Sequence, residues 1–217
     1  MLAPTPANVR PTVQVDLVLV LALDVSSSVD AREYDLQQRG LADAFRHTKV
    51  LDAILSGPHR RIAVSVVQWA GGGEQAVSIP WTLVSNGEDA TGFADRLMQT
   101  RRRFRDGVTD ISGIITFSAQ HALSGPYVTA RRVVDVSGDG IDNVQYSPHR
   151  ARDAAVAAGI TINGLTILNE TPDLEDYYRL TVIGGENAFV MTAANYHDYA
   201  LAILRKLVRE IRPRRLS

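Results

Sequence analysis

The residues best suited to chemistry in this chain are an aspartate and two serines at alternate positions, in Asp24-Val25-Ser26-Ser27-Ser28. One carboxylate followed by two hydroxyls at every second position can turn three oxygen atoms toward one point. Hard divalent cations such as Mg²⁺ prefer oxygen ligands in octahedral geometry. The same residue types also cap helices that follow strands, so these five residues alone do not separate a metal site from a helix cap.

Two further oxygen donors lie in separate loops. Thr109 precedes a predicted helix, and Asp139 follows a predicted strand within Ser-Gly-Asp-Gly. Alternating strands and helices bring such loops to one edge of a sheet, next to the carboxyl end of the first strand. We therefore predict that three loops converge there and contribute five metal ligands, namely Asp24, Ser26, Ser28, Thr109 and Asp139.

The elements that position these residues follow from hydrophobic periodicity. The near-continuous apolar run over 13–25 is typical of a central parallel strand covered on both faces. Further strands are predicted over 61–69, 132–136, 160–168 and 188–191, and helices over 30–55, 89–100, 110–123, 148–158, 173–180 and 196–212. A glycine run over 71–73 leads into an alternating stretch over 75–83, which predicts an antiparallel edge strand.

This order predicts an α/β fold with a doubly wound, mostly parallel central sheet, one antiparallel edge strand and helices on both faces. With 217 residues, the chain fits one domain. We predict a flexible leader over 1–13, which contains Pro4, Pro6 and Pro11, a single domain over 14–212, and a basic tail over 213–217.

Composition excludes several classes of protein. The formal net charge of −1 gives no global attraction to nucleic acid, and the absence of cysteine excludes thiolate metal sites and cysteine nucleophiles. The longest apolar run is too short to span a bilayer. The N-terminus shows no basic segment followed by an apolar one, as a signal peptide would, but such a leader is compatible with a removed signal. We expect a periplasmic or secreted location, with the cytoplasm as the alternative.

These motifs, taken together, resemble the von Willebrand factor type A (VWA) family. Its metal-ion-dependent adhesion site joins Asp-x-Ser-x-Ser, a threonine before the fourth helix, and Asp-Gly after a central strand. The motif order, the spacing and the apolar strand before each motif match over 14–211. The sequence is most similar to uncharacterised bacterial single-domain members, and the resemblance implies the VWA variant of a Rossmann-like fold.

The resemblance implies roles for the five residues. Ser26, Ser28 and Thr109 would supply hydroxyl ligands, and Asp24 and Asp139 would bind the cation directly or through water. Mg²⁺ is the expected cation, with Mn²⁺ or Ca²⁺ as alternatives. Few direct carboxylates leave such a cation underneutralised, so an acidic side chain of a partner protein can complete its coordination. The expected function is metal-dependent protein binding, in adhesion or scaffolding, by a monomer.

Two alternatives remain. A metal-dependent hydrolase or phosphate-transfer enzyme would need a second carboxylate where Ser26 stands or a Gly-x-Ser-x-Gly elbow, and neither is present. Asp110 and Asp142 are the nearest candidate bases. A purely structural domain, in which the metal only ties loops together, is the other alternative. We expect no enzyme activity.

Several residues near the motifs have open roles. Asp142 and Asn143 follow the Asp139 motif and lie either beside the metal or in a solvated polar turn. The basic run Arg101-Arg102-Arg103 with Arg105 either rims the metal face, where it would favour an acidic partner, or complements a helix dipole. Trp69 and Trp81 are interpreted as strand packing, and the five histidines lack metal-ligand spacing.

Overall fold

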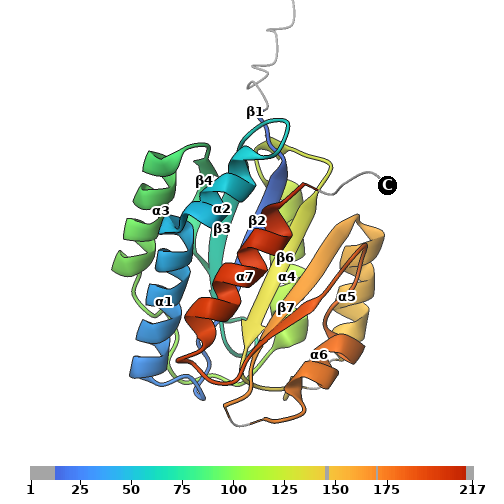
Figure 1. Ribbon diagram of the computed structural model, residues 1–217. Helices are drawn as coiled ribbons and strands as arrows, with labels where there is room; N and C mark the ends of the chain where they lie inside the picture. Colours follow the sequence, from blue (N-terminus) through green and yellow to red (C-terminus); the bar gives the residue numbers. More distant parts are fainter. Residues whose placement is uncertain (1–12, 145–146, 170, 214–217) are drawn as a thin grey trace, which may run out of the picture.

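The computed structural model describes residues 13–144, 147–169 and 171–213 and contains a six-stranded sheet (Figure 1). The strand order is β4-β3-β2-β6-β7-β8. β4 pairs antiparallel with β3 at one edge, and the other pairs are parallel. The predicted fold class is therefore confirmed. The strands are β2 (Leu17–Asp24), β3 (Ile62–Trp69), β4 (Gln75–Val84), β6 (Arg132–Gly138), β7 (Ile160–Ile167) and β8 (Val190–Ala193).

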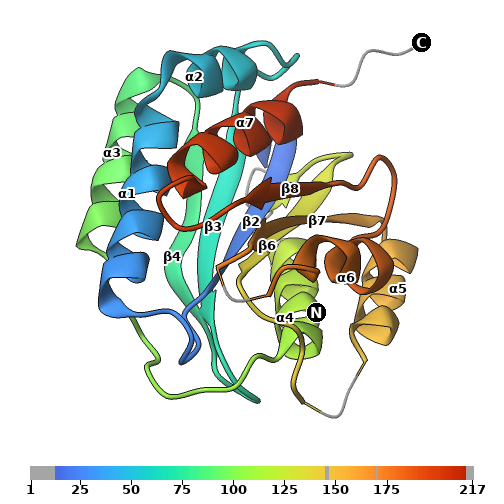
Figure 2. The same cartoon turned by 60° about the horizontal axis from the view of Figure 1, so that its bottom comes forward.

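Helices cover both faces of the sheet (Figures 1 and 2). One face carries α1 (Ala31–Arg46), α2 (Thr48–Leu55), α3 (Gly87–Gln99) and α7 (Tyr199–Ile211). The opposite face carries α4 (Ile111–Ser124), α5 (Pro148–Ala157) and α6 (Leu174–Thr181). The result is a three-layer α/β arrangement that buries the central strands completely.

Strand β2 divides its side chains between two cores, because successive residues of a strand point to opposite faces. Leucines at every second position, from Leu17 to Leu23, join the core under α1 and α7. Val18, Val20 and Ala22 join the core under α4. Each buried leucine contributes about 2 kcal/mol, so this strand is held rigidly from both sides.

The chain changes direction across the sheet between β2 and β6. From β2 it proceeds to β3 and β4 on one side, and then returns through α3 and α4 to β6 on the other side. Ligand crevices of α/β sheets form at such points, beyond the carboxyl ends of the strands. Asp24 ends β2 and Asp139 directly follows β6, so both lie at this crevice. The carboxyl end of β2, from which the chain enters α1, is at the lower end of the sheet in Figure 1.

The single helix predicted over 30–55 is wrong, because the structure contains two helices that meet at His47. The backbone of His47 is extended, with φ −78° and ψ 133°. Its imidazole Nδ1 accepts a hydrogen bond from the Lys49 N–H at 3.1 Å and thereby caps α2. Neither glycine nor proline occurs at this break, and the apolar residues keep helical spacing across it. The sequence therefore predicts one helix where the structure has two.

Other boundaries differ by a few residues. Val13, predicted as the end of the leader, lies in β1 (Val13–Gln14), which pairs with β5 (Tyr127–Val128) in a small parallel sheet that we did not predict. The strand predicted over 188–191 is shifted to β8, and the last helix begins at Tyr199 rather than at 196. Residues 1–12 and 214–217 of the predicted leader and tail lie outside the described residues.

Both edges of the sheet are irregular or short. In β4, the pairing register with β3 shifts between Val64 and Val67. The exposed Pro80 lies at this shift and has no N–H to offer to a further strand. At the opposite edge, β8 has four residues. These features limit the addition of strands at either side.

A buried cluster of charges fastens α7 to the sheet. The Lys206 ammonium lies 2.7 Å from Asp135 Oδ1 and 2.5 Å from Glu210 Oε1. Asn163 Nδ2 donates to the same Glu210 oxygen at 2.8 Å. Two carboxylates thus share one ammonium, and burial together with the charge of Glu210 raises the pKa of Asp135 to about 7.

This cluster predicts that stability falls as pH rises from about 5 to about 8. The carboxyl of Asp135 titrates near 7 when folded and near its ordinary value of 3.8 when unfolded, so the folded state holds the extra proton in between. Asp135→Asn should reduce the loss of unfolding free energy between about pH 5 and about pH 8 by on the order of 2 kcal/mol. Urea unfolding at both pH values measures this difference. Asp176→Asn is the control, because Asp176 is exposed, and it should leave the change of unfolding free energy with pH as in the parent. The prediction would be contradicted if Asp135→Asn showed the same change with pH as the parent.

Candidate metal centre

Asp24 is buried at the end of β2, and its carboxylate is only half satisfied. Oδ1 accepts a hydrogen bond from the Ser26 N–H at 2.8 Å. Oδ2 is buried and has no hydrogen-bond partner among the described residues. Burying a carboxylate oxygen without a partner costs free energy of desolvation. A bound cation or a hydrogen-bond donor at Oδ2 would offset this cost.

Ser26, Ser28 and Asp139 form a chain of contacts beside this carboxylate. The hydroxyls of Ser26 and Ser28 lie 3.2 Å apart, and Ser28 Oγ donates to Asp139 Oδ1 at 2.7 Å. The hydroxyl of Tyr196 donates to Asp139 Oδ2 at 3.0 Å. The structure therefore brings four of the five predicted ligands together, and Tyr196 adds a contact that no sequence motif indicated.

Thr109 reaches the same edge from the loop before α4. The N–H of Ser27 donates to the carbonyl of Gly107 at 3.1 Å, which joins this loop to the serine loop. A Cβ atom added at Gly140 would lie 3.5 Å from Thr109 Oγ1. The hydroxyl of Thr109 thus lies beside the residue that follows Asp139.

Asp142 and Asn143 position Thr109 and the start of α4. Asn143 Oδ1 accepts from the Thr109 N–H at 2.8 Å, and the Asn143 N–H donates back to the Thr109 carbonyl at 3.1 Å. Asp142 Oδ2 accepts from the N–H groups of Ile111 and Ser112 at 2.8 and 3.2 Å. Of the two interpretations, these bonds favour a place in the site over a solvated turn.

The basic run contributes one residue to the back of the serine loop. Arg102 Nη2 donates to the carbonyls of Val25 and Ser26 at 3.0 and 2.8 Å. Helix α3 ends at Gln99, so the run lies beyond its last turn and does not complement its dipole closely. Arg102 instead fixes the backbone that carries the predicted ligands.

Two buried carboxylates dominate the electrostatics of the site. Burial, followed by the negative charge of Asp139, raises the pKa of Asp24 to about 7, although the Ser26 hydrogen bonds and Arg102 oppose this rise. Burial and the two aspartates also raise the pKa values of Tyr178 and Tyr196. Both tyrosines remain protonated at neutral pH, and Tyr196 remains the hydrogen donor to Asp139.

The residues present fit a hard divalent cation. Two carboxylates and two serine hydroxyls lie together at the crevice, Thr109 reaches the same edge, and one carboxylate oxygen there lacks a partner among the described residues. Within the described ranges, no group of three or more His, Cys, Asp or Glu side chains is suited to hold a metal. A cation here would therefore depend on the serine and threonine hydroxyls as much as on carboxylates, which suits Mg²⁺ better than a thiolate- or imidazole-binding metal.

The chain matches the model of one known protein family. A family model described as "Protein of unknown function (DUF1194)" matches residues 14–215. The chain belongs to this family. No curated protein matches the DUF1194 chain in sequence.

Solved structures show that this DUF1194 chain has the fold of VWA domains. Proximal thread matrix protein 1 from the mussel byssus superposes with a TM-score of 0.65 at 17% identity, over 91% of this chain and 48% of that protein. A von Willebrand factor type A structure from Catenulispora acidiphila gives 0.61 at 13% identity, over 91% and 43%. The pilus adhesin SpaC from Lactobacillus rhamnosus GG gives 0.65 at 12% identity, over 93% and 31%. The chain thus spans half or less of each of these proteins.

One of these neighbours was also solved with a bound metal. A further structure of the mussel protein is described as having a zinc-occupied MIDAS motif, with a TM-score of 0.60 and 17% identity over 91% of this chain and 48% of that protein. Among the described residues of the DUF1194 chain, none of the helices is both long and apolar enough to cross a membrane.

Gly138 should tolerate no side chain, because it lies against both Tyr178 and Asp24. An added Cβ would lie 2.6 Å from Tyr178 Oη and 3.1 Å from Asp24 Oδ2. Gly138→Ala should lower the free energy of unfolding by about 1–3 kcal/mol, measured by urea denaturation. The matched control Gly140→Ala meets its nearest atom at 3.5 Å and should cost less than about 1 kcal/mol; equal costs would argue against crowding at Gly138.

Proposed function

We propose that this chain is a metal-dependent protein-binding module. The observation that carries the proposal is the unpartnered, buried Oδ2 of Asp24, next to a second buried carboxylate and a pair of serine hydroxyls. A resident divalent cation, which we propose to be Mg²⁺, would satisfy that oxygen and offset the repulsion between Asp24 and Asp139.

The residues of the proposed site have different roles in holding the cation. Ser26, Ser28 and Thr109 present neutral hydroxyl oxygens, and Asp24 and Asp139 supply the negative charge. Ser28 and Tyr196 orient the Asp139 carboxylate through hydrogen bonds. Because most of the proposed ligands are neutral hydroxyls, a bound divalent cation would stay underneutralised when an aspartate binds it through water, and it would then attract an acidic side chain of a partner protein.

The structural neighbours support an adhesive or scaffolding role outside the cytoplasm, which is part of the proposal. One neighbour is described as a thread matrix protein, and another as a pilus adhesin. The zinc-occupied motif of the mussel protein supports a divalent cation in this fold.

We further propose that the module binds its partner without catalysing a reaction. The two candidate bases are both engaged in holding α4. Asp110 Oδ1 accepts the Gly113 N–H at 2.7 Å, and Asp142 accepts the N–H groups of Ile111 and Ser112. These backbone hydrogen bonds tie both carboxylates to the start of α4, even though burial raises the pKa of Asp142 above its ordinary value.

Metal titration tests the site directly. Isothermal titration of Mg²⁺, Mn²⁺ and Ca²⁺ into chelator-treated protein should show saturable binding by the parent. Ser26→Ala, Ser28→Ala and the double variant Asp24→Ala with Ser26→Ala should each weaken binding by about tenfold or more, as loss of a ligand removes at least 1.4 kcal/mol.

Ser27→Ala is the matched control, because Ser27 lies within the same motif but is not a predicted ligand, and the side-chain contacts of the motif join Ser26, Ser28 and Asp139. Its affinity should stay within about twofold of the parent. If the parent binds none of the three metals, or if Ser27→Ala weakens binding as much as Ser26→Ala, the proposed ligand set is wrong.

Selection from a random peptide library tests the partner chemistry. With the metal identified by titration, the peptides recovered on the parent protein should share an aspartate or glutamate whose replacement by the amide abolishes binding. Addition of a chelator should release them. Recovery of the same peptides with and without metal would instead support the purely structural role of the site.

A further inference from the structure

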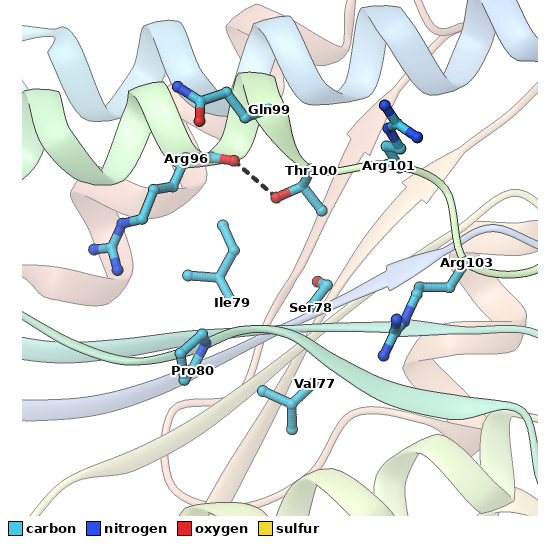
Figure 3. Close-up of a pocket in the computed structure, with 9 residues that line it drawn as sticks. All are labelled: Val77, Ser78, Ile79, Pro80, Arg96, Gln99, Thr100, Arg101 and Arg103. Carbon is cyan, nitrogen blue, oxygen red and sulfur yellow. Dashed lines mark hydrogen bonds between the residues drawn. The ribbon is translucent and has the colours of Figure 1, made fainter.

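A second polar feature lies away from the metal centre, in a pocket of about 350 Å³ between β4 and α3 (Figure 3). Its floor is the edge strand β4, and its wall is the end of α3 with the segment that follows. No carboxylate lines it. The lining residues are Val77, Ser78, Ile79, Pro80, Arg96, Gln99, Thr100, Arg101 and Arg103.

Three arginines line this pocket without a neutralising partner, and the guanidinium of one of them, Arg101, points away from β4 in Figure 3. Figure 3 shows Arg96 and Arg103 on opposite sides of Ser78 and Ile79. Arg96 Nη2 donates to Thr82 Oγ1 at 3.0 Å, a neutral acceptor. In the described part of the chain, no carboxylate lies within 4.0 Å of the guanidinium of Arg96, Arg101 or Arg103. The pocket therefore has an uncompensated positive charge in a concave setting.

The backbone that carries two of these arginines is fixed from beneath. Buried Gln68 accepts the Arg103 N–H at 2.8 Å and donates to the Arg101 carbonyl at 3.2 Å. The Tyr34 hydroxyl donates to the Thr100 carbonyl at 2.9 Å. Because the segment is held in place before any ligand arrives, little ordering of the backbone opposes binding.

Alternate residues of the basic run serve different sites. Arg102 points to the back of the serine loop, where it holds two backbone carbonyls. Arg101 and Arg103, on either side of it, line the pocket. The uncompensated charge thus belongs to the pocket and is separate from the metal centre.

From this arrangement we propose that the pocket binds a phosphate or sulfate monoester group. Guanidinium groups bind tetrahedral oxyanions through paired N–H donors, and Arg96 and Arg103 supply such groups on opposite sides of Ser78 and Ile79. The apolar side chains of Val77, Ile79 and Pro80 can contact the organic part of the ester. A volume of about 350 Å³ is at the small end of ligand pockets, so it fits a small ester or the end group of a larger one.

The test is a titration of the full chain with inorganic phosphate, and separately with sulfate, followed by backbone amide chemical shifts in NMR. Ionic strength is held constant with chloride, and a chelator is present so that no metal attracts the anion. Saturable shifts should occur at the pocket residues with a dissociation constant of about 1 mM. A preference for one anion identifies the kind of ester.

Variants distinguish the pocket from general attraction to positive charge. Arg103→Gln and Arg96→Gln should each weaken binding by about tenfold. Arg105→Gln is the matched control, since Arg105 belongs to the same run but does not line the pocket, and it should change affinity by less than about twofold. Circular dichroism checks that each variant is folded.

Two results would overturn the proposal. One is the absence of saturable shifts with both anions, and the other is an equal loss of affinity in Arg105→Gln and Arg103→Gln. Because the titration is made without metal, its failure leaves the metal-binding proposal unaffected, and failure of the metal titration leaves this one unaffected.

Discussion

The structure is organised around two carboxylates that are buried side by side where β2 and β6 end. Burial and mutual repulsion hold the pKa of Asp24 near 7, and the contacts at this edge reduce that cost. Ser28 and Tyr196 donate hydrogen bonds to Asp139, and Arg102 fixes the serine loop. The doubly wound topology makes the arrangement possible, because it leaves a crevice between these two strand ends.

The molecule contains a second pair of buried acids, which differs from Asp24 and Asp139 in having a cation beside it. The acids Asp135 and Glu210 are also buried together, and the ammonium of Lys206 lies between them. At the crevice, Arg102 is the one cationic side chain among the described residues that acts on Asp24, and its donors are directed at backbone carbonyls. One acidic pair thus carries a built-in counter-charge and the other does not. This difference supports the interpretation that the pair at the crevice takes its cation from solution.

The fold and the convergence of the loops could be predicted from sequence, because they depend on strong patterns. Apolar strands followed by Asp24 and Asp139 determine which edge the polar side chains share. The break at His47 could not be predicted, since a side-chain cap on the backbone leaves no trace in hydrophobic periodicity. The roles of Tyr196 and Arg102 were equally hidden, because each depends on contacts between residues far apart in the chain. The role of the predicted ligands as metal ligands stays a prediction.

The irregular edges of the sheet have a consequence for how this protein can associate. The register shift at Pro80 interrupts the outer hydrogen-bonding row of β4, and β8 offers only a short row at the opposite side. Association by backbone pairing, which joins sheets into fibres or continuous dimers, therefore finds little to extend. Recognition is left to side chains on the loops and helices, which can differ between relatives while the sheet stays unchanged.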